Sequence, residues 1–200
     1  MTRIIAIDQA TTTGYCLGGT EIPPAEWHTG AFSAPKRPEE GARLIVIHDT
    51  IVGLIERHDP DVLLYEEPYD PTWDAVTKIK QGGEARVGYN RSTMQFLQRV
   101  KGAVIMAAAR FDLPTEGCSP KSWQASLQLP KPPPFQGTKE VVYRDRKKWI
   151  KGAIQNKVRM LGGVAEKEDA YDAWGICFYG CFGKSAAKRA QTDLLEGLMT

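Results

Sequence analysis

The segment IIAIDQATTTGYCL (residues 4–17) decides the fold class of this 200-residue chain. The run from Arg3 to Asp8 is rich in β-branched residues and predicts a strand that ends in an acid. Residues 11–17 predict a second strand after a tight, Thr-rich turn. The chain therefore begins with a β-hairpin, and Asp8 stands at the end of its first strand.

A second strand that ends in an acid follows in residues 61–65 (DVLLY). This segment is short and almost entirely apolar, which is typical of a strand buried on both faces of a sheet. Glu66 and Glu67 come directly after it. Because neighbouring residues of a strand point to opposite faces, only one of these two acids can share a face with Asp8.

The remaining segments alternate between strand and helix patterns. Further strands are expected at 27–33 and 115–118, and helices at 39–58, 92–110, 120–127, 142–161 and 168–182. Residues 70–90 and the Pro-rich residues 129–137 predict irregular connections. This order predicts an α/β fold with a mixed sheet. One domain is expected over residues 1–182, followed by a tail or short helix over 183–200.

The overall composition is that of a folded protein, with 42% hydrophobic and 25% charged residues. It argues against disordered and fibrous classes. No window reaches the roughly 18 apolar residues of a membrane span, and the N-terminal residues lack a signal-peptide pattern, so we expect a cytoplasmic protein without a membrane partner. The four cysteines predict reduced, buried thiols rather than disulfides or a zinc site.

The charge is distributed unevenly along the chain. Residues 78–159 contain 17 Lys and Arg but five Asp and Glu, whereas the whole chain has a net charge of only +2. Aromatic residues lie within this basic tract. Basic residues interleaved with aromatic ones favour a nucleic-acid surface, although a solvated helix face remains the alternative. The aromatic residues are Tyr89, Phe96, Trp123, Phe135, Tyr143 and Trp149.

Four acids form the candidate catalytic site: Asp8, Glu66, Asp169 and Asp172. Asp169 and Asp172 are three residues apart on a predicted helix, so they share one face of it. Two strands that end beside this helix would add Asp8 and Glu66. Clustered carboxylates are suited to Mg²⁺ or Mn²⁺, and a pair of such ions can hydrolyse a phosphodiester. The opposing interpretation is that these acids are turn formers, helix caps or solvent-facing residues.

Four segments of the chain resemble the RuvC-like Holliday junction resolvases. The opening segment 4–17 is similar to the family's first strand and Thr-Gly hairpin. LLYEEPY (63–69) resembles the strand that carries its catalytic Glu, and KEDAYDAWGIC (167–177) resembles its closing helix. RSTMQFLQRVKGAVIMAAA (91–109) looks like its central helix. The resemblance implies a ribonuclease H-like fold and places the family's catalytic acids on the four residues above.

The resemblance also implies a reaction and its partners. A member of this family would resolve four-way junctions by paired nicks, as a homodimer that uses two Mg²⁺ ions per site, with Mn²⁺ able to substitute. Lys147 matches a lysine that stabilises the transition state, and Tyr69 matches an aromatic residue that stacks on an unpaired base. Candidate DNA contacts are Tyr69, Lys78, Lys80, Arg86, Arg91, Lys121, Arg144, Arg146 and Lys148.

Two other interpretations stay open. A degenerate nuclease fold could bind branched DNA without cutting it, although all four acids are present. The segment IDQATTTG (7–14) also resembles the first phosphate loop of actin-like ATPases and sugar kinases, but 200 residues are short for their two lobes and no second glycine-rich loop is visible. Against the degenerate nuclease, a catalytic site that had decayed would be expected to lack at least one of the four acids.

Overall fold

A computed structural model describes residues 2–34, 39–68 and 91–183 of the chain, except for the side chains of Arg91 and Glu140. Five strands form one sheet in the order β3-β2-β1-β4-β5. Strands β1, β2 and β3 are antiparallel, whereas β4 runs parallel to β1 and β5 runs parallel to β4. The strands are β1 (Arg3–Asp8), β2 (Thr12–Gly19), β3 (His28–Ser33), β4 (Val62–Glu66) and β5 (Thr115–Cys118).

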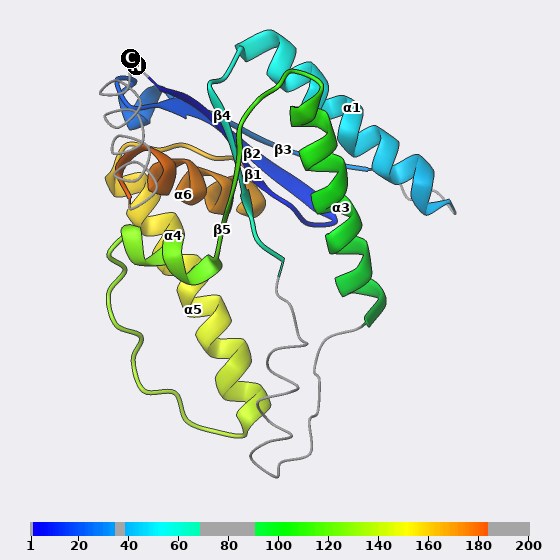
Figure 1. Cartoon of the computed structure of the whole chain (residues 1–200). Coiled ribbons are helices and arrows are strands. Elements are labelled where there is room, and N and C mark those ends of the chain that lie inside the picture. The colour runs from blue at the N-terminus through cyan, green and yellow to red at the C-terminus, as the bar shows by residue number, and fades with distance from the viewer. Residues whose placement is uncertain (1, 35–38, 69–90, 184–200) are drawn as a thin grey trace, which may run out of the picture.

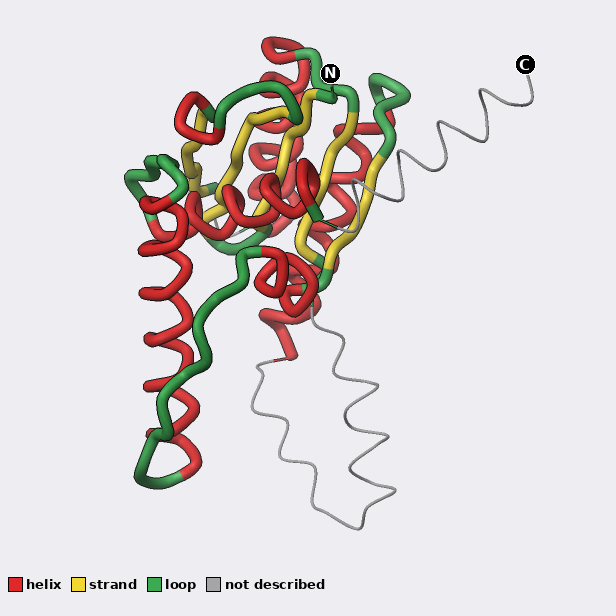
Figure 2. Tube along the Cα trace, turned by 90° about the vertical axis from the view of Figure 1, so that its left-hand side faces the viewer, coloured by secondary structure: helices red, strands yellow, loops and turns green. Residues whose placement is uncertain are grey.

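Helices cover both faces of this sheet (Figure 1). One face is covered by α1 and α3, and the other by α4, α5 and α6. Figure 2 shows that α5 extends well beyond the edge of the sheet. None of the helices in the described part of the chain is long and apolar enough to cross a membrane. The helices are α1 (Glu40–His58), α3 (Arg91–Ala109), α4 (Pro120–Ser126), α5 (Lys139–Met160), α6 (Glu168–Phe182) and the short 3₁₀ helix η1 (Pro24–Glu26).

The predicted α/β architecture with a mixed sheet is confirmed, and most element boundaries agree within two residues. The largest difference is the start of α5, which was expected at 142 and lies at Lys139. The Thr138 side chain accepts a hydrogen bond from the backbone N–H of Val141, so Thr138 caps the helix earlier than the apolar pattern begins. The 3₁₀ helix was not predicted.

Strand alternation divides the core into two clusters. Ile4, Ala6 and Leu64 pack on the side of α6, whereas Ile5, Ile7 and Leu63 pack on the side of α1 and α3. Continuing the alternation by two residues from Ala6 and Leu64 puts Asp8 and Glu66 on the side of α6. The sheet therefore presents both strand acids to the helix that carries Asp169 and Asp172.

Gly14 brings α6 close to this end of the sheet. It pairs with Asp8 across the β1–β2 ladder, and a Cβ atom at this position would overlap the backbone carbonyl of Asp169. Only a residue without a side chain lets α6 approach here. The glycine of the hairpin therefore sets the separation between Asp8 and the first turn of α6.

Gly14→Ala is expected to destabilise the protein by about 2 kcal/mol or more, because the added methyl group must displace α6 backbone. Gly53→Ala is the matched control, since Gly53 lies in α1 with nothing within 4 Å of an added Cβ. In a helix this exchange favours folding by roughly 0.5–1 kcal/mol. Urea unfolding of both variants measures the difference, and equal stability of the two would contradict the close approach of α6.

Candidate active site

The four predicted acids lie at one end of the sheet and interact electrostatically. Asp8 is buried, with 8% of its surface exposed, at the end of β1. Burial, followed by the charges of Glu66, Asp172 and Asp169, raises the pKa of Asp8 well above its usual value. The structure therefore brings together side chains that are more than 160 residues apart in the sequence.

The same causes act on the helix acids. Burial and the charge of Glu66 raise the pKa of Asp172 to about 7. Burial also raises the pKa of Asp169, which is opposed by the positive charge of Lys151. Each of these groups gains a proton more readily in the folded chain than in water, because a low-dielectric cluster of like charges disfavours ionisation. The cluster is short of positive charge.

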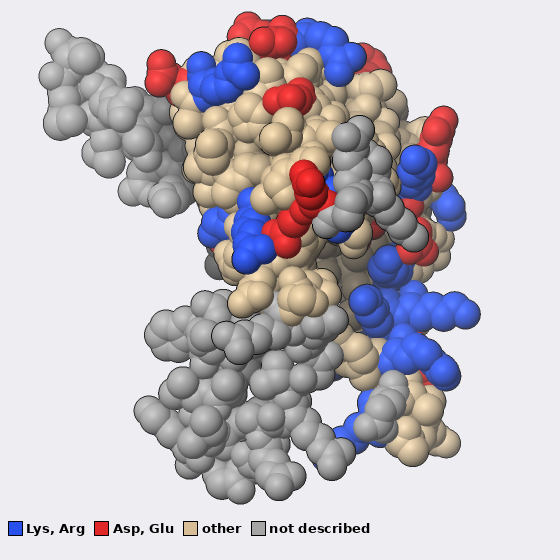
Figure 3. Space-filling view, turned by 90° about the vertical axis from the view of Figure 1, so that its right-hand side faces the viewer, with Lys and Arg blue, Asp and Glu red and all other residues tan. Residues whose placement is uncertain are grey.

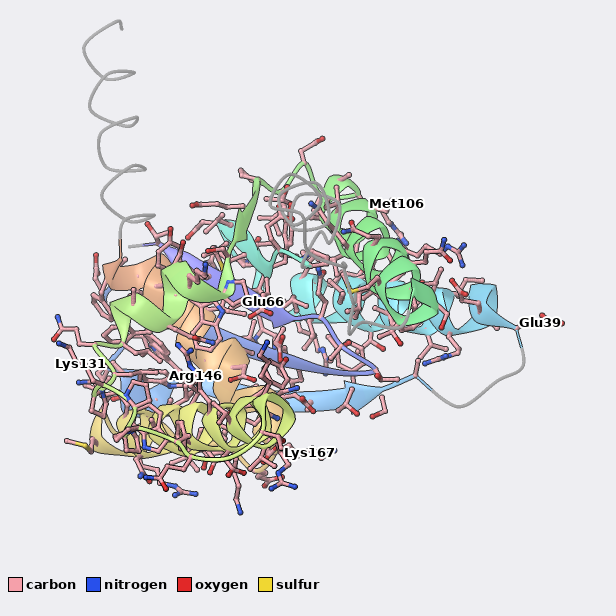
Figure 4. All side chains as sticks on the ribbon, turned by 90° about the horizontal axis from the view of Figure 1, so that it is seen from below. Glu39, Glu66, Met106, Lys131, Arg146 and Lys167 are labelled. Carbon is pink, nitrogen blue, oxygen red and sulfur yellow. The ribbon has the colours of Figure 1, made fainter. Side chains whose placement is uncertain are left out.

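Glu66 is held by a tryptophan. Its Oε2 accepts a hydrogen bond of 2.7 Å from Nε1 of Trp123, which is 2% exposed and belongs to α4. Burial raises the pKa of Glu66, and the hydrogen bond from Trp123 opposes this shift. Figure 4 shows Glu66 near the centre of the lower face, between the helices on the two sides of the sheet. The interpretation of Trp123 as part of a DNA surface is wrong, because this ring is in the core.

Glu67 takes the opposite face, as strand alternation requires. Its Oε2 accepts a hydrogen bond of 2.6 Å from Nζ of Lys101 on α3, and its Oε1 accepts one of 3.2 Å from the hydroxyl of Tyr65. Glu67 is thus neutralised on the side of α3. Of the two neighbouring acids, Glu66 is the one that shares a face with Asp8.

Lys151 is a cation whose charge acts on Asp8, Asp169 and Asp172, and it was not singled out from the sequence. Its Nζ donates a 2.7 Å hydrogen bond to Oε2 of Glu168. That contact raises the pKa of Lys151, and the charges of Asp172 and Asp169 raise it further. Lys151 in turn lowers the pKa of Asp8. Its charge therefore acts on both the strand and the helix acids.

Lys147, which was predicted to assist catalysis, is exposed one turn before Lys151. Residues four apart share one face of a helix, so the two lysines point to the same side of α5. Nothing in the structure tests the role of Lys147, and that role stays a prediction.

The predicted DNA contacts divide into two groups. Arg144, Arg146, Lys148 and Lys121 are exposed, the first three on α5 and the last at the start of α4. Arg146 is on the α5 side of the lower face (Figure 4). The side chain of Arg91 is not described, although α3 begins there. The predicted contacts Tyr69, Lys78, Lys80 and Arg86 lie outside the described residues.

The donor set suits hard divalent cations. All four side chains offer carboxylate oxygens, and burial raises the pKa of each of them. Neighbouring acids add to this shift for Asp8, Asp169 and Asp172, and a bound cation would relieve that repulsion. Among the described residues, no three or more His, Cys, Asp or Glu side chains are gathered tightly enough to enclose an ion. The residues therefore fit the expected ions in the chemistry of their donor atoms, whereas the described side chains do not form a closed cage.

If the chain nicks DNA junctions, as the sequence resemblance implies, Trp123→Phe is expected to lower that activity about tenfold, because Glu66 loses the donor that orients it. Trp27→Phe is the matched control. Trp27 is also buried and donates its Nε1 hydrogen to the backbone oxygen of Ile22, which is not one of the four acids. Both variants should lose similar stability, as measured by thermal unfolding. Equal loss of nicking in both would show that Trp123 acts only through stability.

No family model matches the chain, and no curated protein matches it by sequence. Solved structures do match. RuvC of Thermus thermophilus in complex with a Holliday junction substrate has a TM-score of 0.57 at 16% identity, over 92% of this chain and 97% of that chain. Another structure of Thermus thermophilus RuvC has a TM-score of 0.53 at 18% identity, over 90% and 96%.

The yeast mitochondrial Holliday junction resolvase Ydc2 matches with a TM-score of 0.52 at 12% identity, over 91% of this chain and 77% of that chain. The RuvC-like ribonuclease H fold expected from the sequence is therefore confirmed. At these identities the likeness extends to the fold alone.

Proposed function

We propose that this chain is a divalent-metal-dependent endonuclease that resolves four-way DNA junctions. The observation that carries the proposal is the meeting of Asp8, Glu66 and Asp172 at one end of a RuvC-like sheet. The charges of Glu66 and Asp172 raise the pKa of Asp8, and the charge of Glu66 also raises the pKa of Asp172. Buried carboxylates without a matching number of cations weaken a fold, so their presence calls for a function. One structural neighbour is in complex with a Holliday junction substrate and another is named a Holliday junction resolvase, and both support the choice of substrate.

The four acids would hold two Mg²⁺ ions, and Mn²⁺ would substitute, because both are hard cations that prefer oxygen ligands. When bound, such ions activate a water molecule and stabilise the oxygen that leaves the scissile phosphate. The protein supplies rigid positions for the ligands. Asp8 is fixed by the β1–β2 ladder, and Glu66 is fixed by its hydrogen bond to Trp123.

Lys151 would add positive charge beside the reacting phosphate. Lys151 stays protonated, because its hydrogen bond to Glu168 and the charges of Asp172 and Asp169 raise its pKa. A fixed cation in a partly buried site stabilises charge that develops in a transition state. We propose that Lys151 takes the role first assigned to Lys147.

A basic stripe on α5 would guide the DNA backbone to the acids. Arg144 is three and four residues before the adjacent Lys147 and Lys148, and Lys151 follows them by four and three residues. All four therefore follow one side of the helix, with Lys151 at the end that carries charge to the acids. Figure 3 shows Lys and Arg side chains gathered at the lower right, where α5 extends below the body of the molecule. Contacts of this kind bind phosphates without reading bases, so affinity should fall steeply with salt.

We propose a homodimer, because a two-fold substrate that needs two nicks suits a two-fold enzyme. The small residues of α3 are one candidate for the dimer surface, but Ala103, Ala107 and Ala108 are buried against the core of this chain. The outer face of α3 and α1 is another candidate. Met106 on α3 is 65% exposed and Ile45 on α1 is 61% exposed.

The proposal is tested with an end-labelled oligonucleotide junction incubated with Mg²⁺, Mn²⁺ or EDTA, beside a linear duplex of the same sequence. Nicks in the junction with either metal, none with EDTA, and little cutting of the duplex are expected. Binding to the junction without nicks in either metal would favour a non-catalytic DNA-binding protein. If the protein neither binds nor nicks the junction, both interpretations are refuted.

A further inference from the structure

An open groove runs along α5 beside the Pro-rich connection of residues 129–137, and neither the four acids nor the basic stripe accounts for it. Its volume is about 710 Å³. The connection contributes Pro130 and Phe135, and α5 contributes residues from Asp145 to Met160. Figure 2 shows the connection running beside α5. We call this feature the α5 groove.

The α5 groove is elongated and opens to solvent. The α5 residues that line it recur every three or four positions over 15 residues, which corresponds to roughly 22 Å along the helix. Gly152 and Ala153 line the middle of the groove, and their lack of a large side chain leaves space there. A groove of this shape accommodates an extended chain better than a compact small molecule.

Its lining combines aromatic rings with positive charge. Phe135 and Trp149 are half-buried, and neither belongs to the two core clusters, so their rings are available to a ligand. Lys148 and Lys157 also line the groove, against a single acid, Asp145. The helix as a whole contains eight Lys and Arg but only two acids. The charge therefore complements a polyanion.

The α5 groove faces away from the acid cluster. Trp149 and Lys151 are two positions apart, which places them about 200° apart around the helix. Lys151 faces Glu168 and the helix acids, so Trp149 and the groove lie on the other side of α5. Lys148 lies between the two sides, because it belongs to both the basic stripe and the groove lining. A strand in the groove would continue from the stripe without entering the active site.

We propose that the α5 groove binds a single-stranded DNA segment of a branched substrate, with bases stacked on Trp149 and Phe135 and the backbone near Lys148 and Lys157. Stacking on aromatic rings beside a positively charged track is how proteins bind unpaired strands without sequence preference. This inference rests on the proposed function. It extends the substrate class from fully paired junctions to branched DNA with an unpaired arm.

The test uses fluorescence anisotropy in EDTA with two labelled probes, a 15-nucleotide oligothymidylate and a fully paired four-way junction. Wild-type protein is expected to bind both. Trp149→Ala should weaken binding of the oligothymidylate about tenfold and leave junction binding within about twofold. Phe111→Ala is the aromatic control, since Phe111 is 38% exposed near the end of α3 and should change neither affinity.

Gly152→Leu gives a second variant that does not depend on removing an aromatic ring. An added Cβ at Gly152 meets nothing within 4 Å, and leucine favours a helix more than glycine does, so the variant should fold while its side chain fills the groove. It should also weaken oligothymidylate binding about tenfold. Thermal unfolding checks that both variants are folded.

The inference and the proposed function fail in different ways. If wild type nicks the junction but does not bind oligothymidylate, only the inference is overturned. It is also overturned if Trp149→Ala and Gly152→Leu bind oligothymidylate as wild type does, because unpaired DNA would then be held outside the groove. If the junction is neither bound nor nicked, the proposed function fails, and the inference fails with it because it rests on that function.

Discussion

Asp8→Asn is expected to abolish junction nicking, by about 10³-fold or more, and at the same time to stabilise the protein in EDTA. Activity falls because Asn has no negative charge with which to hold a divalent cation. Stability rises because Asp8 is buried among three other acids, and the neutral amide removes this repulsion while keeping a similar shape. Few substitutions would change activity and stability in opposite directions, so the combination is diagnostic.

The sign of the stability effect follows from the pKa values of the acids. The pKa of Asp172 is about 7 in the folded chain, against an ordinary value of 3.8. Between these values the folded chain binds more protons than the unfolded chain, so stability is lost as pH rises. Each pKa unit corresponds to about 1.4 kcal/mol. In EDTA the wild type should therefore melt at a lower temperature at pH 8 than at pH 5, and Asp8→Asn should reduce this difference.

Differential scanning fluorimetry measures both effects. Mg²⁺ should raise the melting temperature of the wild type at pH 8 but not that of Asp8→Asn. Asp112→Asn is the matched control, because Asp112 is exposed and Asn tolerates its left-handed backbone. A melting temperature of Asp8→Asn below that of the wild type in EDTA would contradict the repulsive cluster.

Lys151→Met should reduce nicking about 10²-fold, with junction affinity lowered by less than about fivefold. The side chain keeps most of its length but loses the charge that acts on Asp8, Asp169 and Asp172. Removing a cation from an acid cluster also increases the repulsion there, so the variant should melt at a lower temperature in EDTA. Single-turnover nicking rates, with a binding assay in parallel, separate the two effects.

Lys147→Met is the natural comparison, because Lys147 lies on the same side of α5 one turn away and is exposed. If Lys151 acts on the reacting phosphate, Lys147→Met should lower affinity slightly and leave the single-turnover rate within about fivefold. The reverse order of the two effects would restore the catalytic role to Lys147.

The meeting of the four acids could be predicted from the sequence, because it depends on short-range rules. Strand alternation puts Asp8 and Glu66 on one face once β1 and β4 are parallel neighbours, and a spacing of three puts Asp169 and Asp172 on one side of α6. The same alternation separated Glu66 from Glu67. The Thr-Gly hairpin was expected from the sequence, but the close approach of the α6 backbone to Gly14 was not.

The supporting residues could not be predicted, because they depend on how helices pack. Trp123 looked like an aromatic of a basic tract, but α4 folds against α6 and turns its ring into the core. Whether the Lys151 side chain faces the acids depends on how α5 is rotated about its own axis. A signal for it was present, since Ile154 and Val158 mark the buried side of α5 and Lys151 is three positions before Ile154. Which lysine of that side meets the acids is a matter of tertiary contact.

The described part of the chain forms a single sheet with helices on both faces, and the second lobe that an actin-like ATPase needs is not found in it. The nucleotide-binding interpretation therefore gains no support from the described residues.

Cleavage of a supercoiled plasmid that extrudes a cruciform tests the central proposal most directly. Two coordinated nicks across the four-way junction convert the plasmid to a linear molecule, whereas a single nick relaxes the supercoiling, absorbs the cruciform and yields an open circle. We predict linear product with Mg²⁺, none with EDTA, and none with Asp8→Asn. An open circle as the sole product, or no cleavage while the plasmid is bound, would contradict junction resolution by this chain.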